Sequence, residues 1–174
     1  VVGVDGVWIG RGFYNGHCRT LGLPTEGCAA RLRQHHPVYH FEDQLQGHIA
    51  VPAALAEEDF IVRRRDGLYA YNLAVVVDDM DSGITEIVRG ADLLEPTVRQ
   101  IALYQTLGAD VPAWVHLPLA VLADGNKLSK QNHAPALAQD DVRPALWQAL
   151  TFLGQCPPPC LRENTVDEII AWGI

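Results

Sequence analysis

A short basic loop, Lys127-Leu128-Ser129-Lys130, carries side chains suited to binding a polyphosphate. It follows Val115–Leu122, which predicts a strand, and the tight-turn dipeptide Asp124-Gly125. Ligands of parallel sheets bind at the carboxyl ends of the strands. Two ammonium groups placed there could neutralise the charge that develops when an α-phosphate is attacked and pyrophosphate leaves. Taken alone, however, such a tetrapeptide is more often an exposed lysine loop.

A glycine-containing turn near the start of the chain, Tyr14-Asn15-Gly16-His17-Cys18, suggests a second kind of chemistry. Cys and His are ligands that zinc prefers, but two or three ligands do not complete a tetrahedral site. Cys156 and Cys160 are separated by three prolines, which is not the spacing of a metal knuckle, and we interpret them as incidental. Nothing in the sequence indicates an oxidising compartment, so the four cysteines do not predict disulfides.

The composition limits the class of protein that carries these residues. A chain of 174 residues with 48% hydrophobic residues suits a globular domain with a real core. No apolar run approaches the roughly 18 to 20 residues of a membrane span. The net charge of −8 argues against a general nucleic-acid coat. Five basic residues gather in Arg31, Arg33 and Arg63–Arg65, as either a charged strand edge or a local basic face.

The elements that must position these residues change in type along the chain. Residues 1–65 predict a β-rich part, since four short, roughly alternating segments indicate a small antiparallel sheet. These segments are Ala29–Arg33, Val38–Phe41, His48–Val51 and Phe60–Arg64.

From residue 66 to 154, strands and helices alternate, which predicts an α/β domain with a parallel sheet. The apolar run Leu73–Val77 fits a buried strand or a buried helix, and its pattern does not decide between them. Ile84–Val88 predicts a strand, and Pro96 opens a helix that Gly108 ends. Arg143–Leu153 predicts an amphipathic helix, and residues 155–174 predict a helical tail.

Five motifs in a fixed order connect these elements to a known family. They are Tyr69–Asp79, Ile84–Asp92, Arg99-Gln100, His116–Leu119 and Lys127–Lys130. The series resembles the second half of the catalytic domain of class I glutamyl-tRNA synthetases, where YNxAVVVDD, a strand ending in Arg-Gly, HLPL and KLSK follow one another. The resemblance covers roughly residues 59–153. It implies the second half of a Rossmann-like catalytic domain that binds ATP and glutamate.

Within this family, the chain is similar to a short branch, the glutamyl-queuosine tRNA(Asp) synthetases. The similarity lies in Arg63–Leu68, Arg89–Leu93, Lys127–Ala136 and Tyr14–Arg19. In that branch the Tyr and the Cys of the turn bind zinc, which implies that Tyr14 and Cys18 hold a structural zinc ion in a β-rich insertion domain. The branch also lacks a large anticodon-binding domain. The stretch after Lys130 is too short for one, although a chain truncated at its C-terminus would give the same length.

The resemblance implies roles for five side chains. Arg89 would bind a carboxylate of glutamate through its planar fork, and Tyr71 would line the amino-acid pocket. Lys130 would be the catalytic residue that contacts ATP and the pyrophosphate-like transition state, and Lys127 and Ser129 would help to bind ATP. Magnesium would accompany ATP. The alternative roles are structural: a strand-end arginine for Arg89 and a core aromatic for Tyr71.

The implied enzyme is a cytoplasmic, monomeric ligase of the aminoacyl-tRNA synthetase type. The α-carboxylate of glutamate would attack the α-phosphate of ATP, without help from tRNA. Glutamate would then pass from the adenylate to a hydroxyl of queuosine in tRNA(Asp). Positioning and charge stabilisation supply the rate of such steps. This fits a sequence in which no Ser/His/Asp or Cys/His constellation is evident.

The sequence departs from the family at its beginning. The His-Ile-Gly-His-type ATP motif and the Cys-x-Cys zinc pair of the family have no counterpart, and Val1–Trp8 matches no family segment. We therefore expect a chain truncated at its N-terminus and inactive by itself. Two alternatives stay open: a catalytic-domain fragment of a glutamyl-tRNA synthetase that charges tRNA(Glu), and a non-catalytic RNA-binding relative.

Overall fold

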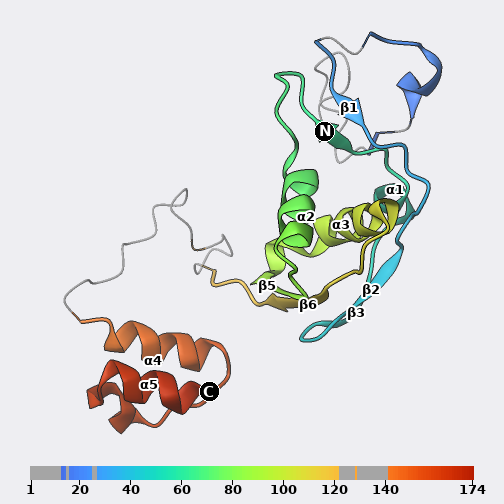
Figure 1. Ribbon diagram of the computed structural model, residues 1–174. Coiled ribbons are helices and arrows are strands. Elements are labelled where there is room, and N and C mark those ends of the chain that lie inside the picture. The colour runs from blue at the N-terminus through green and yellow to red at the C-terminus, as the bar shows by residue number, and fades with distance from the viewer. Residues whose placement is uncertain (1–12, 15, 25–26, 122–127, 129–140) are drawn as a thin grey trace. The chain divides into compact units, whose positions relative to one another are not determined.

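The computed structural model describes residues 13–14, 16–24, 27–121, 128 and 141–174 (Figure 1). The chain forms two compact units, Val1–Leu117 and Pro118–Ile174. This division coincides with neither of the predicted boundaries, near residues 65 and 155, and the three predicted segments stay a prediction. No helix in the described ranges is both long enough and apolar enough to cross a membrane.

The first unit begins with short elements and continues with longer ones. In chain order, these are η1 (His17–Thr20), β1 (Ala30–Arg31), β2 (His40–Asp43), β3 (Gly47–Ala50), α1 (Ala53–Ala56), β4 (Ile61–Arg63), α2 (Tyr71–Asp81), β5 (Glu86–Gly90), η2 (Ala91–Leu93), α3 (Leu94–Leu107) and β6 (Ala113–Leu117).

The β-rich part does not form the single antiparallel sheet that the sequence predicts. Each predicted segment overlaps an observed strand, with β2 two residues later than predicted, but the strands form two separate antiparallel pairs, β1 with β4 and β2 with β3. The β2–β3 hairpin is instead attached to β6, because the Gln44 N–H donates to the Trp114 carbonyl at 2.8 Å. The hairpin therefore packs against the α/β part, where its buried Phe41 and Asp43 find partners.

The apolar run Leu73–Val77 lies in helix α2, which resolves the alternative that the sequence leaves open. In a strand, Leu73, Val75 and Val77 would share one face. The structure instead buries Val76, packs Leu73 and Met80 against the core and leaves Val77 exposed. That spacing of three and four residues is the apolar stripe of a helix.

The α/β part is a parallel pair of strands, β5 and β6, connected by α3. Arg89 lies opposite His116 in the ladder, and both are close to the carboxyl ends of their strands. The strands confirm the predicted α/β class. Helix α3 begins at Leu94, two residues before the predicted start, since Pro96 in the first turn gives up only an N–H that has no helical partner. It ends at Gly108, as predicted, with a φ of 70°.

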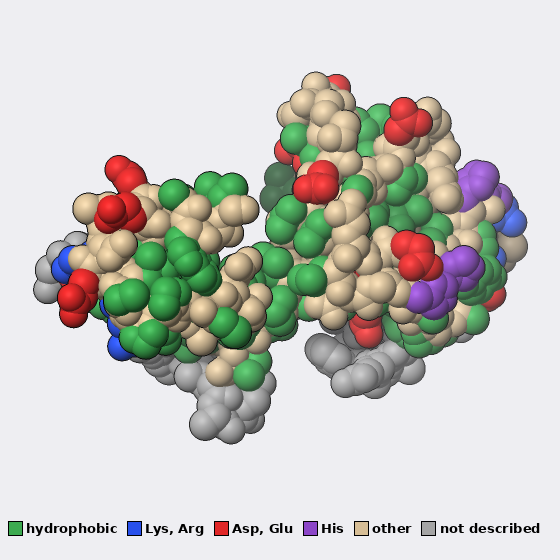
Figure 2. Space-filling model, turned by 90° about the horizontal axis from the view of Figure 1, so that it is seen from below, with side chains coloured by type: hydrophobic (Ala, Val, Ile, Leu, Met, Phe, Trp, Pro, Cys, Tyr) green, Lys and Arg blue, Asp and Glu red, His purple; other side chains and the backbone are tan. Residues whose placement is uncertain are grey.

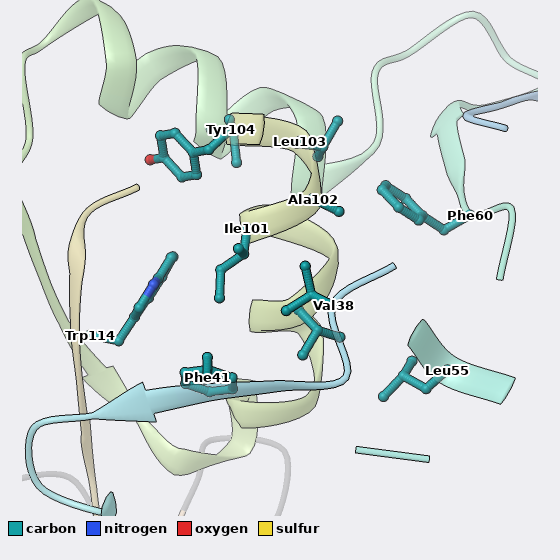
Figure 3. Packing of buried hydrophobic residues seen from close by; sticks show 11 residues of the cluster. Val38, Phe41, Leu55, Phe60, Ile101, Ala102, Leu103, Tyr104 and Trp114 are labelled. Atoms are coloured by element: carbon teal, nitrogen blue, oxygen red, sulfur yellow. The ribbon is translucent and has the colours of Figure 1, made fainter. Parts of the chain in front are cut away.

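One hydrophobic core joins the β-rich and α/β parts of the first unit. Figure 3 shows Ile101 of α3 pointing toward the space between Trp114 of β6 and Phe41 of β2. Leu55 and Phe60, which precede residue 65 in sequence, belong to the same cluster. Helix α3 is central to the cluster, which also contains Val38, Val76, Val98, Ala102, Leu103 and Tyr104.

The second unit contains helix α4 (Arg143–Phe152), the short helix η4 (Pro159–Glu163) and helix α5 (Val166–Gly173). Helix α4 agrees with its prediction to within one residue at each end, and α5 lies within the predicted helical tail. Helix α5 begins with a capping box in which the Thr165 hydroxyl accepts from the Glu168 N–H. The described cysteines, Cys156 and Cys160 of this unit among them, are free thiols.

Candidate functional site

Arg89 lies near the end of β5, and its guanidinium is held from several sides. Its Nε donates to Nε2 of His116 at 3.0 Å. One terminal nitrogen, Nη2, donates to the Thr97 hydroxyl at 2.7 Å and to the Leu93 carbonyl at 3.3 Å. The guanidinium carbon lies 4.8 Å from the centre of the Trp114 ring. These contacts fix the plane of the fork, which is what a carboxylate-binding arginine requires.

Tyr71 is the first residue of α2, and its side chain is 55% exposed. It interacts with Arg89: burial lowers the pKa of the guanidinium, and Tyr71 and Asp79 act to raise that pKa. The two residues that the resemblance assigns to glutamate are therefore neighbours. The high exposure of Tyr71 does not suit the alternative of a core aromatic. Asn72, which follows it, accepts a hydrogen bond from Gln100 at 3.1 Å and ties α2 to α3.

Two buried aromatic residues beside Arg89 carry polar atoms without a partner. The Tyr104 hydroxyl and the Trp114 Nε1 make no hydrogen bond to the described residues. Burial, together with the charge of Asp79, raises the pKa of Tyr104 to about 12. The Tyr104 hydroxyl thus stays protonated and can donate a hydrogen bond at any physiological pH.

A buried carboxylate supports Arg89 from the hairpin. Asp43 Oδ2 lies 2.7 Å from Nδ1 of His116, and both side chains are 0% exposed. Burial favours a higher pKa for Asp43, but hydrogen bonds from the Gln46 N–H and from His116 outweigh it and lower that pKa. We call Asp43, His116, Arg89 and Thr97 the Arg89 cluster. Sequence reasoning missed Asp43 and Thr97, and it used His116 only as part of the HLPL motif.

The Tyr14–Cys18 turn, which contains the two predicted zinc ligands, is held by other carboxylates. The Cys18 N–H donates to the Tyr14 hydroxyl at 2.6 Å, so the two residues are in contact. The Tyr14 N–H donates to the Glu58 carboxylate at 3.0 Å. The Arg31 guanidinium lies 4.0 Å from the centre of the Tyr14 ring. Burial and the Cys18 side chain raise the pKa of Tyr14.

The turn borders an open cavity of about 470 Å³. Tyr14 and Cys18 lie on its wall together with Cys28, and several arginines, Asp59 and apolar residues also line it. Within the described part of the chain, no group of three or more His, Cys, Asp and Glu side chains is arranged to hold a metal ion. The described residues therefore supply two neighbouring ligands of the kind that zinc takes, one phenol and one thiol.

The predicted ATP-binding residues Lys127, Ser129 and Lys130 lie outside the described residues. Leu128, between them, is described, and its N–H donates to the Ala120 carbonyl at 2.8 Å. The roles predicted for the two lysines and the serine stay predictions.

Comparison with known proteins places these features in a family. Residues 24–165 match the family model of the class I tRNA synthetases (E and Q), catalytic domain. The chain is 61% identical over 163 residues to a glutamyl-Q tRNA(Asp) synthetase of Serratia proteamaculans, covering 94% of this chain and 54% of that protein. It is 65% identical to the protein of the same name in Klebsiella pneumoniae, over 94% of this chain and 56% of that protein. The chain thus spans about half the length of the curated relatives it matches.

Solved structures agree with this placement. A glutamate tRNA ligase from Elizabethkingia meningosepticum, in complex with its amino acid, aligns with a TM-score of 0.53 at 25% identity, over 68% of this chain and 27% of that one. The glutamate-tRNA synthetase of Elizabethkingia anophelis aligns with a TM-score of 0.63 at 21% identity, over 91% of this chain and 39% of that one, and shows the fold alone. Motif order, parallel strands and family match converge: the chain belongs to the family of class I glutamate and glutamine tRNA synthetases, as part of their catalytic domain.

Proposed function

We propose that the protein to which this chain belongs activates glutamate with ATP and transfers it to queuosine in tRNA(Asp). The observation that carries the proposal is the Arg89 fork, held in place beside the exposed Tyr71 at the carboxyl end of a parallel strand. Ligands of such sheets bind at this edge. The relatives that are 61% and 65% identical are named glutamyl-Q tRNA(Asp) synthetases, which supports this acceptor.

In the first step, an oxygen of the glutamate α-carboxylate attacks the α-phosphorus of ATP, and the bond to the β-phosphate oxygen breaks. The products are glutamyl-adenylate and pyrophosphate. Arg89 binds a carboxylate of glutamate by charge-assisted hydrogen bonds and holds the amino acid in place, while Tyr71 lines its pocket. Lys130, with Lys127 and Ser129, neutralises the charge that develops on the phosphates, and magnesium accompanies ATP.

In the second step, a hydroxyl oxygen of queuosine attacks the activated carbonyl carbon, and AMP leaves with the electrons of the broken acyl–phosphate bond. No side chain of the enzyme forms a covalent intermediate in this scheme. The RNA must approach a basic surface. Few Lys and Arg side chains of the described residues are visible in Figure 2, whereas Arg31, Arg33 and Arg63 line the cavity beside Tyr14.

A structural zinc ion is part of this proposal, with Tyr14 and Cys18 as two of its ligands. The contact between the two residues supports it, and the remaining ligands would come from residues outside those described. A bound ion would fix the turn and play no part in the chemistry. The test is the zinc content of the purified protein, with Cys160→Ser as the control because Cys160 is an exposed thiol of the second unit. Loss of zinc in Cys18→Ser but not in Cys160→Ser supports the assignment, and full zinc content in Cys18→Ser contradicts it.

The function itself is tested by ATP–pyrophosphate exchange with glutamate, using the complete gene product that carries this chain. We expect exchange without any RNA, reduced roughly 100-fold in Lys130→Ala. Arg64→Ala is the matched control, since the Arg64 side chain is 60% exposed and pairs with the exposed Asp66. Transfer of labelled glutamate to tRNA(Asp) with queuosine, and not to tRNA(Asp) without it, would complete the assignment.

A second candidate, charging of tRNA(Glu), is favoured by the glutamate tRNA ligase that is 25% identical over 68% of this chain. It predicts no exchange until tRNA(Glu) is added, because the resemblance implies tRNA-dependent activation for those enzymes. If no exchange is detected either without RNA or with tRNA(Glu), both proposals are contradicted and a non-catalytic RNA-binding relative is favoured. Size-exclusion chromatography of the same sample would test the expected monomer, and cell fractionation would test the expected cytoplasmic location.

A further inference from the structure

Three side chains from three different strands form a buried polar chain that ends at the Arg89 fork. Asp43 is the last residue of β2, His116 lies on β6 and Arg89 on β5. The distances along the chain are 2.7 Å from Asp43 Oδ2 to His116 Nδ1 and 3.0 Å from His116 Nε2 to Arg89 Nε. The hairpin is held in register with β6 by Gln46, whose side-chain amide donates to the His116 carbonyl at 2.8 Å.

The hydrogen bonds determine the protonation of His116. Arg89 Nε always carries a hydrogen and can only donate, so Nε2 of His116 accepts this bond and carries no proton. The Thr97 hydroxyl lies 3.2 Å from the same Nε2 and donates its own proton to the Leu93 carbonyl. Nδ1 then holds the single ring proton and donates it to the Asp43 carboxylate. In this tautomer the imidazole presents a lone pair to the arginine.

Asp43 is well placed to enforce this tautomer. Its Oδ1 accepts backbone N–H groups of Leu45 at 3.0 Å, Gln46 at 2.8 Å and His116 at 3.3 Å. These bonds hold the carboxylate and leave Oδ2 for the imidazole. An ionised carboxylate can only accept, so the proton facing it must come from Nδ1 of His116.

We propose that Asp43 and His116 are positioning residues for glutamate binding, which act through Arg89 by keeping the acceptor Nε2 directed at its Nε. His116, Thr97 and the Leu93 carbonyl accept hydrogen bonds from Nε and Nη2 of Arg89. These bonds leave Nη1 of Arg89 unused and set its direction. This inference rests on the proposed role of Arg89 as the ligand of a glutamate carboxylate.

Asp43→Asn tests the tautomer directly. The amide oxygen of the substituted side chain can keep the three backbone N–H groups, which leaves its NH₂ group to face Nδ1 of His116. The imidazole must then accept at Nδ1 and carry its proton on Nε2, so that two donors face each other at Arg89. In the complete gene product we expect the KM for glutamate to rise roughly tenfold, with the KM for ATP and the folded structure unchanged.

Two substitutions of His116 separate positioning from simple burial. Gln places its amide near the position of Nε2 and can still accept from Arg89, whereas Asn places its amide near Nδ1 and can still donate to Asp43. Positioning predicts that His116→Gln keeps the KM for glutamate within about threefold of the wild type and His116→Asn does not. A structural role alone predicts the opposite order, because His116→Asn satisfies the buried carboxylate. Glu42→Gln, on the exposed side of the same hairpin, is the control.

A measurement without substrate keeps this inference separate from the proposed function. Nitrogen-15 NMR of the complete gene product should show His116 protonated on Nδ1 and unprotonated on Nε2, and the two should exchange roles in Asp43→Asn. A wild-type His116 protonated on Nε2, or an equal rise of both KM values in Asp43→Asn, would overturn the inference. If the wild type shows this tautomer but no glutamate-dependent exchange, the proposed function fails and the Asp43–His116 support of Arg89 stands without its assigned ligand.

Discussion

Buried carboxylates stabilise both the Arg89 cluster and the Tyr14–Cys18 turn, but they bind different groups in the two regions. In the Arg89 cluster, Asp43 supports an imidazole that contacts the functional guanidinium itself. In the turn, Glu58 and Asp59 hold the Tyr14 backbone and the Arg19 side chain. The Tyr14 hydroxyl and Cys18 meet each other at an open cavity.

The difference shows how much of each site this chain supplies. The Arg89 fork is oriented by side chains and backbone within residues 43–116, so its geometry is complete before any ligand binds. The turn supplies two potential ligands and a firm anchor, and the rest of a tetrahedral zinc site needs further groups. Substitutions in the first region should therefore affect glutamate, and substitutions in the second should affect stability and bound metal.

The largest expected effect is on stability, in Glu58→Gln. The Glu58 side chain is 4% exposed and pairs with Arg99 and, at 3.9 Å, with Arg31. Removing one partner of a buried ion pair leaves an uncompensated charge, which costs about 3 to 5 kcal/mol. We expect a loss of this size in the free energy of unfolding, measured by urea denaturation of the complete gene product. Bound zinc should fall as well, because the Tyr14 N–H loses its charged acceptor.

Glu42→Gln is the control for this substitution, since the Glu42 carboxylate is 74% exposed where it meets His48. Exposed pairs contribute about 0 to 1 kcal/mol. If Glu58→Gln raises the KM for glutamate while the zinc content stays constant, the turn and the Arg89 cluster do not have the separate roles assigned to them.

Next in size is the effect of removing the Arg89 fork. Arg89→Met should lower kcat/KM for glutamate in the exchange assay by roughly 100-fold, because charge-assisted hydrogen bonds contribute about 1.5 to 3 kcal/mol each. Arg89→Lys keeps the charge but not the planar fork, and we expect a loss of about tenfold. Zinc content should be the same as in the wild type. A variant Arg89→Met with normal glutamate dependence would show that this arginine is structural.

Much of the fold follows from local patterns in the sequence, and the exceptions have identifiable causes. The existence of β5 and β6, the end of α3 at Gly108 and both helices of the second unit follow from periodicity and glycine or proline signals. The strand bounds differ: β5 lies two residues later than predicted, and β6 spans Ala113–Leu117 where the pattern predicts Val115–Leu122. Whether Leu73–Val77 forms a strand or a helix does not follow from the sequence, because a continuous apolar run fits the periodicity of both. The contact of this segment with α3 decides which of its residues are buried. The separation of the two strand pairs depends likewise on the docking of the hairpin onto β6.

For the candidate site, motifs point to residues but not to their supports. Arg89 and Tyr71 belong to long motifs, and the structure brings them together. Asp43 lies in an ordinary strand–turn sequence, His-Phe-Glu-Asp, in which nothing distinguishes it from a solvated acidic residue. Its burial depends on β6, more than 70 positions away in the chain, and a single sequence carries no signal of that contact.

A smaller effect is expected from Gly16→Ala in the turn. Gly16 has a φ of 82°, a conformation that costs other residues about 1 kcal/mol. An added methyl would also lie 2.8 Å from Nε of Arg19, the group that binds Asp59. Gly22→Ala is the matched control, because Gly22 also has a positive φ but open space around its Cα. The unfolding free energy should fall further in Gly16→Ala than in Gly22→Ala, and equal losses would show that Arg19 adapts without cost.

The last pair of predictions concerns two carboxyl groups whose pKa values shift in opposite directions. Hydrogen bonds from Arg19 lower the pKa of Asp59 in the turn. Burial and the charge of Asp78 raise the pKa of Asp79, which lies beside Arg89. Ionised Asp59 therefore stabilises the fold above the unfolded pKa of about 3.9, and this contribution is lost as the pH falls through the lower folded value. Ionised Asp79 destabilises the fold above its raised folded pKa, and the penalty disappears below about pH 4.

The two substitutions should thus have opposite signs at pH 7. Asp59→Asn should lower the unfolding free energy, and Asp79→Asn should raise it by less than about 1 kcal/mol. Both differences from the wild type should shrink as the pH falls toward 3. For Asp79 the reason is that its carboxyl is then protonated, and for Asp59 it is that the unfolded chain takes up the proton below about 3.9. Urea unfolding at pH 7, 5 and 3 measures this, with the exposed Asp81→Asn as control. A loss of stability in Asp79→Asn at pH 7 would mean that its attraction to Arg89 outweighs burial, which would join Asp79 to the supports of the fork.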